Sequence, residues 1–195
     1  MSLKHALQKT LAEAGSVLER LTQNQEIHRD IEKAINLCVK AYQNQGKILI
    51  CGNGGSACDA AHFAEELVGR YRKNRKALAA LALNEAGVLT CISNDFGYEN
   101  VFSRQIDAFG QPNDIWIGLS TSGNSENILR ACQTAKEKNV RTILFLGKEG
   151  GALKNKADIT IIVPGETSDR IQELHMLLLH FMVEGIERGL FPELY

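Results

Sequence analysis

The stretch KILICGNGGS (residues 47–56) sets an unbroken apolar run against a turn of glycine and small polar residues. Four consecutive apolar side chains followed by turn-forming residues are typical of a strand that is buried on both faces. The next segment, residues 56–72, has the pattern of a helix. A buried strand that turns at glycine into a helix predicts an α/β fold, and the glycines of the turn allow the backbone to approach a ligand closely.

Outward from this stretch, the same alternation of strand and helix continues along the sequence. Helical stretches at 125–138 and 168–188 accompany the later strands. The predicted strands are 47–51, 77–83, 115–119, 142–146 and 159–163. Strands that alternate with helices predict a mostly parallel five-stranded sheet with helices on both faces, which is a three-layer α/β/α sandwich.

The residues before the first strand predict an N-terminal helical extension. Apolar residues between Leu7 and Leu21 form one stripe at helical spacing, and those between Ile31 and Ala41 form a second stripe. We therefore expect two helices within residues 1–45, followed by an α/β core over residues 46–195. No internal repeat or proline-rich linker divides the sequence, so we expect a single domain over residues 1–195.

The composition disfavours several functional classes. The formal net charge of −1 offers no broad basic surface for nucleic acid, and no segment is apolar for long enough to cross a bilayer. Charged residues between Met1 and Leu21 argue against a secretory signal. Five cysteines without a CxxC pair predict neither a disulfide framework nor a cysteine zinc site, so we expect a reducing, cytoplasmic location. The basic run at 70–76 is interpreted as a solvated helix end.

The glycine turn alone resembles a dinucleotide-binding fingerprint, with Gly52, Gly54 and Ala57 at the required spacing. That fingerprint usually requires an acidic residue about 20 residues further on, at the end of the second strand. The nearest candidate, Glu85, lies beyond that distance. The incomplete pattern disfavours NAD as a cofactor.

The third predicted strand ends in the loop Ser120-Thr121-Ser122-Gly123-Asn124-Ser125, directly before a helix. Hydroxyl groups, a glycine and the free N–H groups of a helix start make a neutral cradle for an anion. The loop contains no lysine, so a nucleoside triphosphate with magnesium is not indicated. Ser125 alone would suit a helix cap, but almost the whole loop is hydroxylated. We therefore predict that this loop binds a phosphate group.

These loops are part of a resemblance that covers the whole chain. The sequence resembles the sugar isomerase (SIS) domain family, and within it the bacterial enzymes that convert sedoheptulose 7-phosphate into D-glycero-D-manno-heptose 7-phosphate through an enediol. The matching stretches are CGNGGSACDAAHFAEEL (51–67), SNDFGYENVFSRQ (93–105), STSGNSENI (120–128) and DRIQELHMLLLH (169–180). The resemblance implies the SIS fold, a cytoplasmic homotetramer assembled through residues 1–45, and the first step of nucleotide-activated heptose synthesis for lipopolysaccharide.

The predicted helix at 56–72, which overlaps the matching stretch 51–67, carries a possible pair of metal ligands. His62 and Glu66 lie four residues apart, so their side chains project from one helix face. An ordinary surface contact between them is the alternative, and Glu65 competes with Glu66 for the role. The resemblance selects Glu66. It implies one zinc ion per subunit held by His62, Glu66, Gln172 and His180, with Glu66 and His180 as the catalytic residues.

The spacing of the last two of these ligands is difficult for one helix. Gln172 and His180 lie eight residues apart, which corresponds to about 12 Å along an ideal helix axis. Joint coordination therefore requires extended side chains, a distorted helix or ligands from different subunits. The third option agrees with the implied tetramer. His175, on the same helix, is interpreted as structural.

The resemblance also implies a set of substrate contacts. Two of its members have simpler explanations, because Asp95 suits a turn at 94–97 and Asp169 suits a helix cap. The implied substrate-binding residues are Asn53, Gly54, Gly55, Glu66, Asn94, Asp95, Ser120, Thr121, Ser122, Ser125, Asp169 and Gln172.

Two other functions remain as alternatives. Some SIS proteins of this size bind the bacterial replication initiator and lack the catalytic carboxylate and the final histidine. Others sense sugar phosphates without turnover, usually when fused to a DNA-binding module. Glu66 and His180 are both present here, and no such module accompanies them, so the sequence favours the isomerase.

Overall fold

The computed structural model describes residues 2–195, and Met1, the first residue of the predicted domain, lies outside them. The helices are α1 (Leu3–Gln23), α2 (Gln25–Gln43), α3 (Gly55–Val68), α4 (Ala86–Phe96), α5 (Ser103–Phe109), α6 (Glu126–Glu137) and α7 (Ser168–Leu190). The strands are β1 (Ile48–Gly52), β2 (Ala80–Ala82), β3 (Ile115–Ser120), β4 (Arg141–Gly147) and β5 (Ile159–Val163). None of the helices from Leu3 onward is both long and apolar enough to span a membrane.

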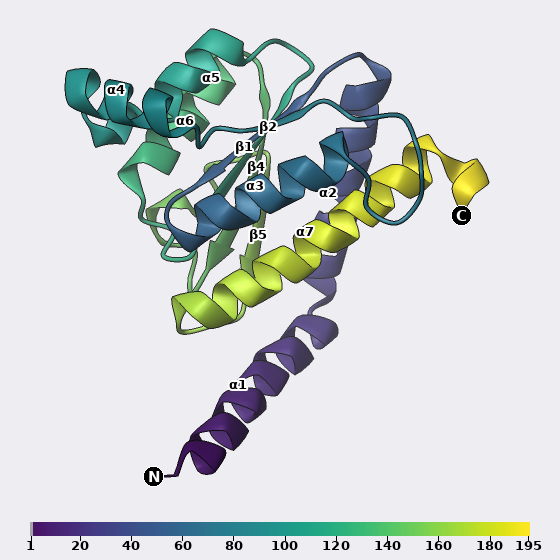
Figure 1. Ribbon diagram of the computed structural model, residues 1–195, viewed down its shortest axis with the longest axis vertical. Coiled ribbons are helices and arrows are strands. Elements are labelled where there is room, and N and C mark those ends of the chain that lie inside the picture. Colours follow the sequence, from purple (N-terminus) through teal and green to yellow (C-terminus); the bar gives the residue numbers. More distant parts are fainter. Residues whose placement is uncertain (1) are drawn as a thin grey trace.

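The five strands form one parallel sheet in the order β2-β1-β3-β4-β5. The chain therefore leaves β1 toward one edge of the sheet and returns on its other side to form β3 (Figure 1). Gly52 at the end of β1 pairs with Leu119 near the end of β3. In open parallel sheets, ligands bind beyond the carboxyl ends of the strands at such a reversal of strand order. The topology thus places the glycine turn and the serine-rich loop at the position where this fold binds ligands.

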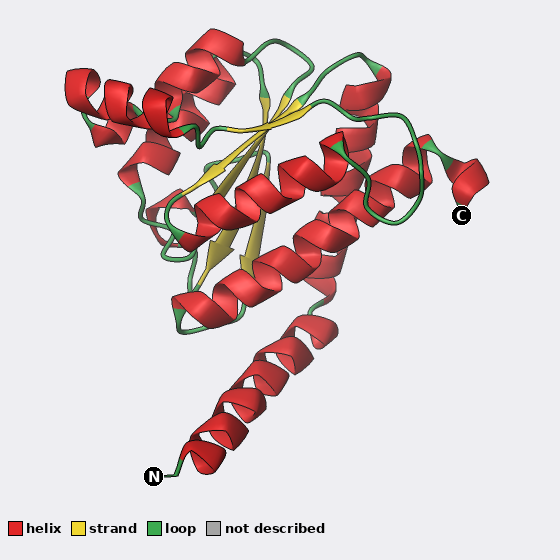
Figure 2. Cartoon of the chain, in the orientation of Figure 1, coloured by secondary structure: helices red, strands yellow, loops and turns green. Residues whose placement is uncertain are grey.

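Alternating strand residues divide the core into two apolar clusters. Ile50 and Ile117 face the layer formed by α2, α3 and α7, whereas Leu49 and Trp116 face the layer formed by α5 and α6. All four side chains are fully buried. Figure 2 shows helices on both sides of the sheet. The predicted three-layer α/β/α sandwich is confirmed.

The predicted N-terminal extension consists of two helices that meet at Asn24. The Asn24 side chain accepts hydrogen bonds at 3.1 Å from the N–H groups of Glu26 and Ile27, which caps α2 and interrupts the helical path. Helix α1 projects away from the body of the molecule (Figures 1 and 2). Its apolar stripe is consequently exposed over most of its length, and only Val17 and Leu21 are buried.

Three sequence predictions were wrong between residues 69 and 97. The helix predicted to reach Arg72 ends at Val68, and the strand predicted over 77–83 is limited to Ala80–Ala82, an edge strand that pairs with β1. Helices α4 and α5 were not predicted. The turn interpretation of 94–97 also fails, because residues 94–96 complete α4 and Gly97, at φ +86°, ends that helix.

The basic run 70–76 is only partly the solvated surface that its charge suggested. Arg72 is exposed, but the side chain of Arg75 has no exposed surface and forms an ion pair with the equally buried Glu187 at 2.8 Å. The solvated interpretation is therefore wrong for Arg75. The cause is tertiary, because the loop after α3 folds back onto α7.

Candidate active site

Three helices begin at the edge of the sheet where the two candidate loops lie. Helices α3, α6 and α7 follow β1, β3 and β5, and none of them has a side-chain cap. Helices α1, α2 and α4 are capped by the side chains of Ser2, Asn24 and Glu85. Uncapped helix starts leave N–H donors and positive dipole ends available for an anion. The three helix starts are therefore suited to hold a phosphate group.

The serine-rich loop is organised by its own hydroxyl groups. Ser120 and Ser125 share a hydrogen bond of 2.9 Å between their Oγ atoms, and the Gly123 N–H donates to Ser120 Oγ at 3.2 Å. Thr121 Oγ1 lies 3.1 Å from Ser168 Oγ, which connects the loop to the start of α7. Ser125 occupies the N-cap position of α6 but bonds Ser120 rather than a helix N–H, so the predicted cap hydrogen bond is absent at this residue.

The serine-rich loop packs against a second backbone turn, at residues 150–153. Gly123 has φ +66°, and a Cβ atom at this position would fall on the carbonyl group of Gly150. The Leu153 N–H donates to Gly123 O at 2.9 Å, and the Ala152 N–H donates to Asn124 Oδ1 at 2.9 Å. Glycine is therefore required here both by the backbone conformation and by the close approach.

The glycine turn after β1 meets the start of α7. A Cβ atom on Gly55 would lie 2.5 Å from Gln172 Nε2, so the missing side chain makes room for the Gln172 amide. The same Nε2 donates to Ser56 Oγ at 3.4 Å. Gly54 adopts φ +56° and ψ −122°, which other residues avoid. The predicted residues Gly54, Gly55 and Gln172 are thus neighbours in space.

Asn127 and Tyr98, which the sequence analysis missed, both contact the predicted residue Asn53 of the glycine turn. Asn53 and Asn127 exchange side-chain hydrogen bonds of 2.9 and 2.8 Å, and the Tyr98 hydroxyl donates to Asn53 Oδ1 at 2.8 Å. Asn127 is buried. An asparagine in the first turn of a helix carries no signal of such a partner 74 residues away. Both residues do lie within stretches that carry the family resemblance.

Helices α3 and α7 pack side by side and run in the same direction. Gln172 lies beside Ser56, His180 lies beside His62, and Glu187 is bound by Arg75, whose guanidinium also bonds the end of α3. This register explains how two residues eight apart on α7 serve one site. Gln172 lies next to the glycine turn, whereas His180 lies about two helical turns further on.

His62, Glu66 and His180 form a cluster on the seam between α3 and α7. His180 Nε2 lies 3.3 Å from His62 Nε2, which lies 3.4 Å from Glu66 Oε1. One ligand atom from each residue lies within 4.8 Å of the others. Two imidazole nitrogens and one carboxylate that face a common point fit a zinc-like ion, which binds such ligands and keeps a further position open in catalytic sites. A single chain supplies all three groups.

The structure also distinguishes the two adjacent glutamates. Glu65 is 69% exposed and its carboxylate is 3.9 Å from His62, whereas Glu66 is 16% exposed and approaches to 3.4 Å. Only Glu66 belongs to the cluster with His180. The choice of Glu66 made from the resemblance agrees with this geometry.

Burial changes the pKa values of groups near the cluster. Desolvation lowers the pKa of His180, and the neighbouring His62 lowers it further, while Glu66 opposes both effects. Desolvation raises the pKa of Asp59, one turn before His62 on α3, to about 6. His175 is fully buried with a pKa lowered to about 4, and its Nε2 bonds Leu146 O at 3.1 Å. These contacts agree with a structural role for His175.

Three predicted substrate residues have other partners in this structure. Asn94 and Asp95 are exposed at the end of α4 and bond to each other at 2.7 Å. Asp169 lies in the first turn of α7, where hydrogen bonds from Thr167 and Arg170 lower its pKa to about 2. The N-cap position belongs to Thr167, so the cap interpretation of Asp169 is wrong.

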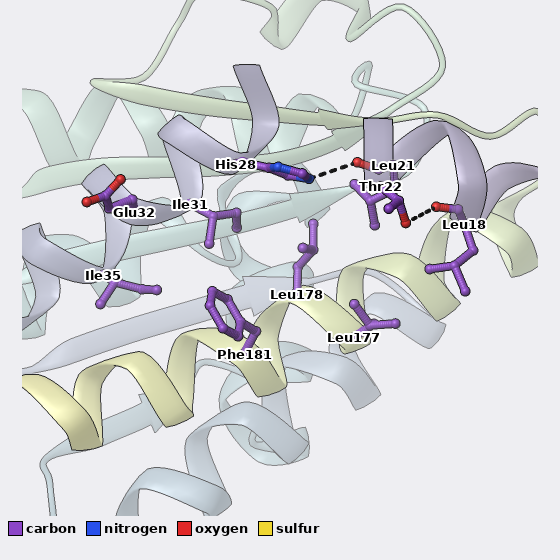
Figure 3. Close-up of a pocket in the computed structure, with 10 residues that line it drawn as sticks. All are labelled: Leu18, Leu21, Thr22, His28, Ile31, Glu32, Ile35, Leu177, Leu178 and Phe181. Carbon is purple, nitrogen blue, oxygen red and sulfur yellow. Dashed lines mark hydrogen bonds between the residues drawn. The ribbon is translucent and has the colours of Figure 1, made fainter. Parts of the chain in front are cut away.

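An apolar groove of about 600 Å³ lies where α1, α2 and α7 meet. Figure 3 shows aliphatic and aromatic side chains from these helices that point into it. Its lining residues are Leu18, Leu21, Thr22, His28, Ile31, Glu32, Ile35, Leu177, Leu178 and Phe181. The groove contains none of the cradle or cluster residues, and its apolar lining suits a protein surface better than a sugar phosphate.

Comparison with known proteins relates this geometry to one family. The model of the SIS domain matches residues 11–147. A phosphoheptose isomerase of Fusobacterium nucleatum is 46% identical over 179 residues, which cover 92% of each chain. One from Helicobacter pylori is 50% identical over 159 residues, covering 81% of this chain and 83% of its own.

Solved structures give the same result. A phosphoheptose isomerase from Neisseria gonorrhoeae superposes with a TM-score of 0.88 at 37% identity, over 95% of this chain and 99% of its own. One from Francisella tularensis reaches a TM-score of 0.92 at 31% identity, over 96% and 100%. The Vibrio vulnificus NanR protein, with a TM-score of 0.66 at 14% identity over 96% and 64%, shares the fold alone.

Proposed function

Because the chain belongs to the SIS domain family, we propose that it is an aldose–ketose isomerase that interconverts sedoheptulose 7-phosphate and D-glycero-D-manno-heptose 7-phosphate. The observation that carries this proposal is the likeness to phosphoheptose isomerases over almost the whole chain. The structure adds a physical reason, because an anion cradle and a cluster of acid–base residues lie along one pair of helices.

The substrate phosphate would bind at the serine-rich loop. Ser120, Thr121, Ser122 and Ser125 supply hydroxyl groups, and the uncapped starts of α3, α6 and α7 supply N–H donors. Asn53, Gly54, Gly55 and Gln172 form the adjacent wall. Asn94, Asp95 and Asp169 remain predicted contacts, and the sugar would have to compete with their present partners.

The isomerisation would take place at the α3–α7 seam. Moving a proton between adjacent carbons requires a base for a weakly acidic C–H group, and Glu66 is the largely buried carboxylate available for it. His180, whose Nε2 faces the same point, would transfer protons to and from the sugar oxygens. The cradle at the other end of the seam would hold the substrate so that its carbonyl end reaches both residues.

His62, Glu66 and His180 would hold a metal ion, for which we propose zinc. When bound, zinc polarises carbonyl and hydroxyl oxygens as a Lewis acid. Gln172 remains a predicted fourth ligand, although its amide contacts Ser56 in this structure. Its position between the cradle and the cluster is equally suited to a substrate hydroxyl.

We expect purified protein to interconvert the two heptose phosphates and to contain about one metal ion per subunit. Removal of the metal with a chelator, verified by elemental analysis, should lower turnover at least tenfold, and added zinc should restore it. The measurement is the isomerase assay with metal content determined on the same sample. Unchanged turnover after complete metal removal would exclude zinc from the reaction. Absence of turnover in the metal-loaded protein would contradict the proposed function.

We also propose that the protein is a homotetramer assembled through residues 1–45 of its single domain. Leu3, Leu7 and Leu11 form an apolar stripe on the projecting helix α1, and their exposed fractions are 89%, 59% and 62%. Phe181, at the apolar groove beside the base of α1, is 52% exposed. Such connected apolar surfaces are typical of an interface between subunits.

Placing a charge in this stripe should therefore weaken assembly. Leu7→Glu is expected to convert the tetramer into smaller species at micromolar concentration, measured by light scattering after size exclusion. The matched control is Gln8→Glu, which adds the same charge next to the stripe and should leave the tetramer intact. A Leu7→Glu variant that remains tetrameric would contradict an interface on α1.

A replication-initiator-binding role is the alternative, and the geometry disfavours it. Glu66 and His180 are not only present but lie together with His62 in one cluster. We propose in addition, from the family resemblance, a cytoplasmic location and a role in supplying heptose to a surface glycan.

A further inference from the structure

The loop that connects α3 to β2 contacts three successive turns of α7. The Tyr71 ring stacks on His180 with centroids 5.6 Å apart and an interplanar angle of 23°. Arg72 forms an ion pair with Glu184, and Arg75 forms one with Glu187, both at 2.8 Å. The loop is therefore docked along the same helix face that presents His180.

Arg75 fixes this loop in place. Its guanidinium donates to the carbonyl oxygens of Glu66 and Leu67 at 2.7 Å and of Gly69 at 3.0 Å. These carbonyls belong to the end of α3, where backbone acceptors have no helical partner. The same guanidinium bonds Glu187 on α7. One buried side chain thus joins the helix that carries Glu66, the loop that carries Tyr71 and the helix that carries His180.

The two aromatic neighbours of His180 contact it in different ways. Tyr71 lies nearly parallel to the ring, whereas the His62 ring meets it edge-on, with centroids 5.0 Å apart at 73°. Stacking on the face of an imidazole restricts rotation of the side chain and leaves the nitrogens on the ring edge free. The free edge is the one that places Nε2 3.3 Å from His62 Nε2.

We propose that Tyr71 is a positioning residue of the reaction, whose ring holds His180 in the orientation that directs its Nε2 toward His62 and Glu66. This inference rests on the proposed isomerase function for its kinetic consequence. The orientation of His180 by Tyr71 can be tested without that function, because the same orientation would determine how well the three-residue cluster binds a metal ion.

The test compares Tyr71→Leu, Tyr71→Phe and a control, Lys73→Ala, which alters an exposed residue of the same loop. Tyr71→Leu should lower kcat by about tenfold to a hundredfold with KM little changed, because the phosphate cradle lies at the other end of the seam. Its zinc affinity should fall by roughly tenfold. Tyr71→Phe keeps the ring and should retain both values, as should Lys73→Ala. The NMR signal of the His180 ring should lose its ring-current shift only in Tyr71→Leu.

Normal kcat and zinc affinity in a folded Tyr71→Leu variant would overturn the proposal. A Tyr71→Phe variant as impaired as Tyr71→Leu would also overturn it, because the hydroxyl rather than the stacked ring would then be responsible. If the wild type does not turn over heptose phosphates, the proposed function fails. The zinc titration and the His180 signal then decide separately whether Tyr71 positions the histidine.

Discussion

Glu66→Gln is expected to reduce kcat by about a thousandfold while the protein folds and assembles normally. Loss of a general base typically costs between about 10² and 10⁴ in rate. Glutamine has almost the same shape as glutamate, so packing is little changed. A neutral amide is a weaker metal donor than a carboxylate, so the two proteins are compared at equal, measured zinc occupancy. What the substitution removes is the ability to accept the proton from carbon.

The neighbouring glutamate provides a matched control for this variant. Glu65→Gln changes the same charge on the same helix, but Glu65 is 69% exposed and outside the cluster. Its activity should remain within about twofold of the wild type. Isomerase rate, exchange of the substrate C–H proton with deuterated solvent and thermal unfolding should be measured on both variants. Full activity or undiminished proton exchange in Glu66→Gln would contradict the role of Glu66 as the base.

The candidate site illustrates which features a sequence reveals by itself. The glycine turn and the serine-rich loop are local, because strand end, turn and helix start follow each other directly in the chain. The pair His62 and Glu66 is also local, since helical spacing alone places both on one face. The fold class was predicted because the alternation of strands and helices is also visible locally along the sequence.

The features that sequence reasoning missed depend on partners far away in the chain. The parallel register of α3 and α7 brings His180 to His62 across 118 residues and leaves Gln172 beside Ser56. From their spacing on one helix, Gln172 and His180 could only be expected to reach toward a single metal site. Packing between helices resolves the difficulty by giving each residue its own place along the seam.

Two charged residues have structural roles that the sequence analysis did not recognise, one of them local and one tertiary. Glu85 was considered only as an acidic residue of a dinucleotide site, yet its carboxylate caps α4 by accepting hydrogen bonds from the N–H groups of Gly87 and Val88. Arg75 was part of an apparently solvated basic run, yet its side chain is completely buried. Charge patterns describe average exposure, and a single residue departs from the average when a buried partner compensates its charge.

Replacing Arg75 with methionine should destabilise the protein by about 3–5 kcal/mol, the usual cost of removing one partner of a buried ion pair. For a chain of this length the expected fall in the unfolding midpoint is roughly 10 °C. Glu187 would remain as a buried charge whose Oε1 has lost its donor, although Tyr195 OH would still donate to Oε2. Thermal and urea unfolding measure the loss.

A double variant separates the ion pair from the second role of Arg75. If the pair alone mattered, Arg75→Met combined with Glu187→Met would be nearly as stable as the wild type, because apolar residues often replace a buried pair without cost. The structure predicts only partial recovery, because the carbonyl oxygens of Glu66, Leu67 and Gly69 lose their donor in either background. Tyr195→Phe, which removes one hydrogen bond to the Glu187 carboxylate, should cost about 1.5–3 kcal/mol. Complete recovery in the double variant would show that Arg75 serves the ion pair and not the end of α3. Arg75 would then have no part in fixing the position of Glu66.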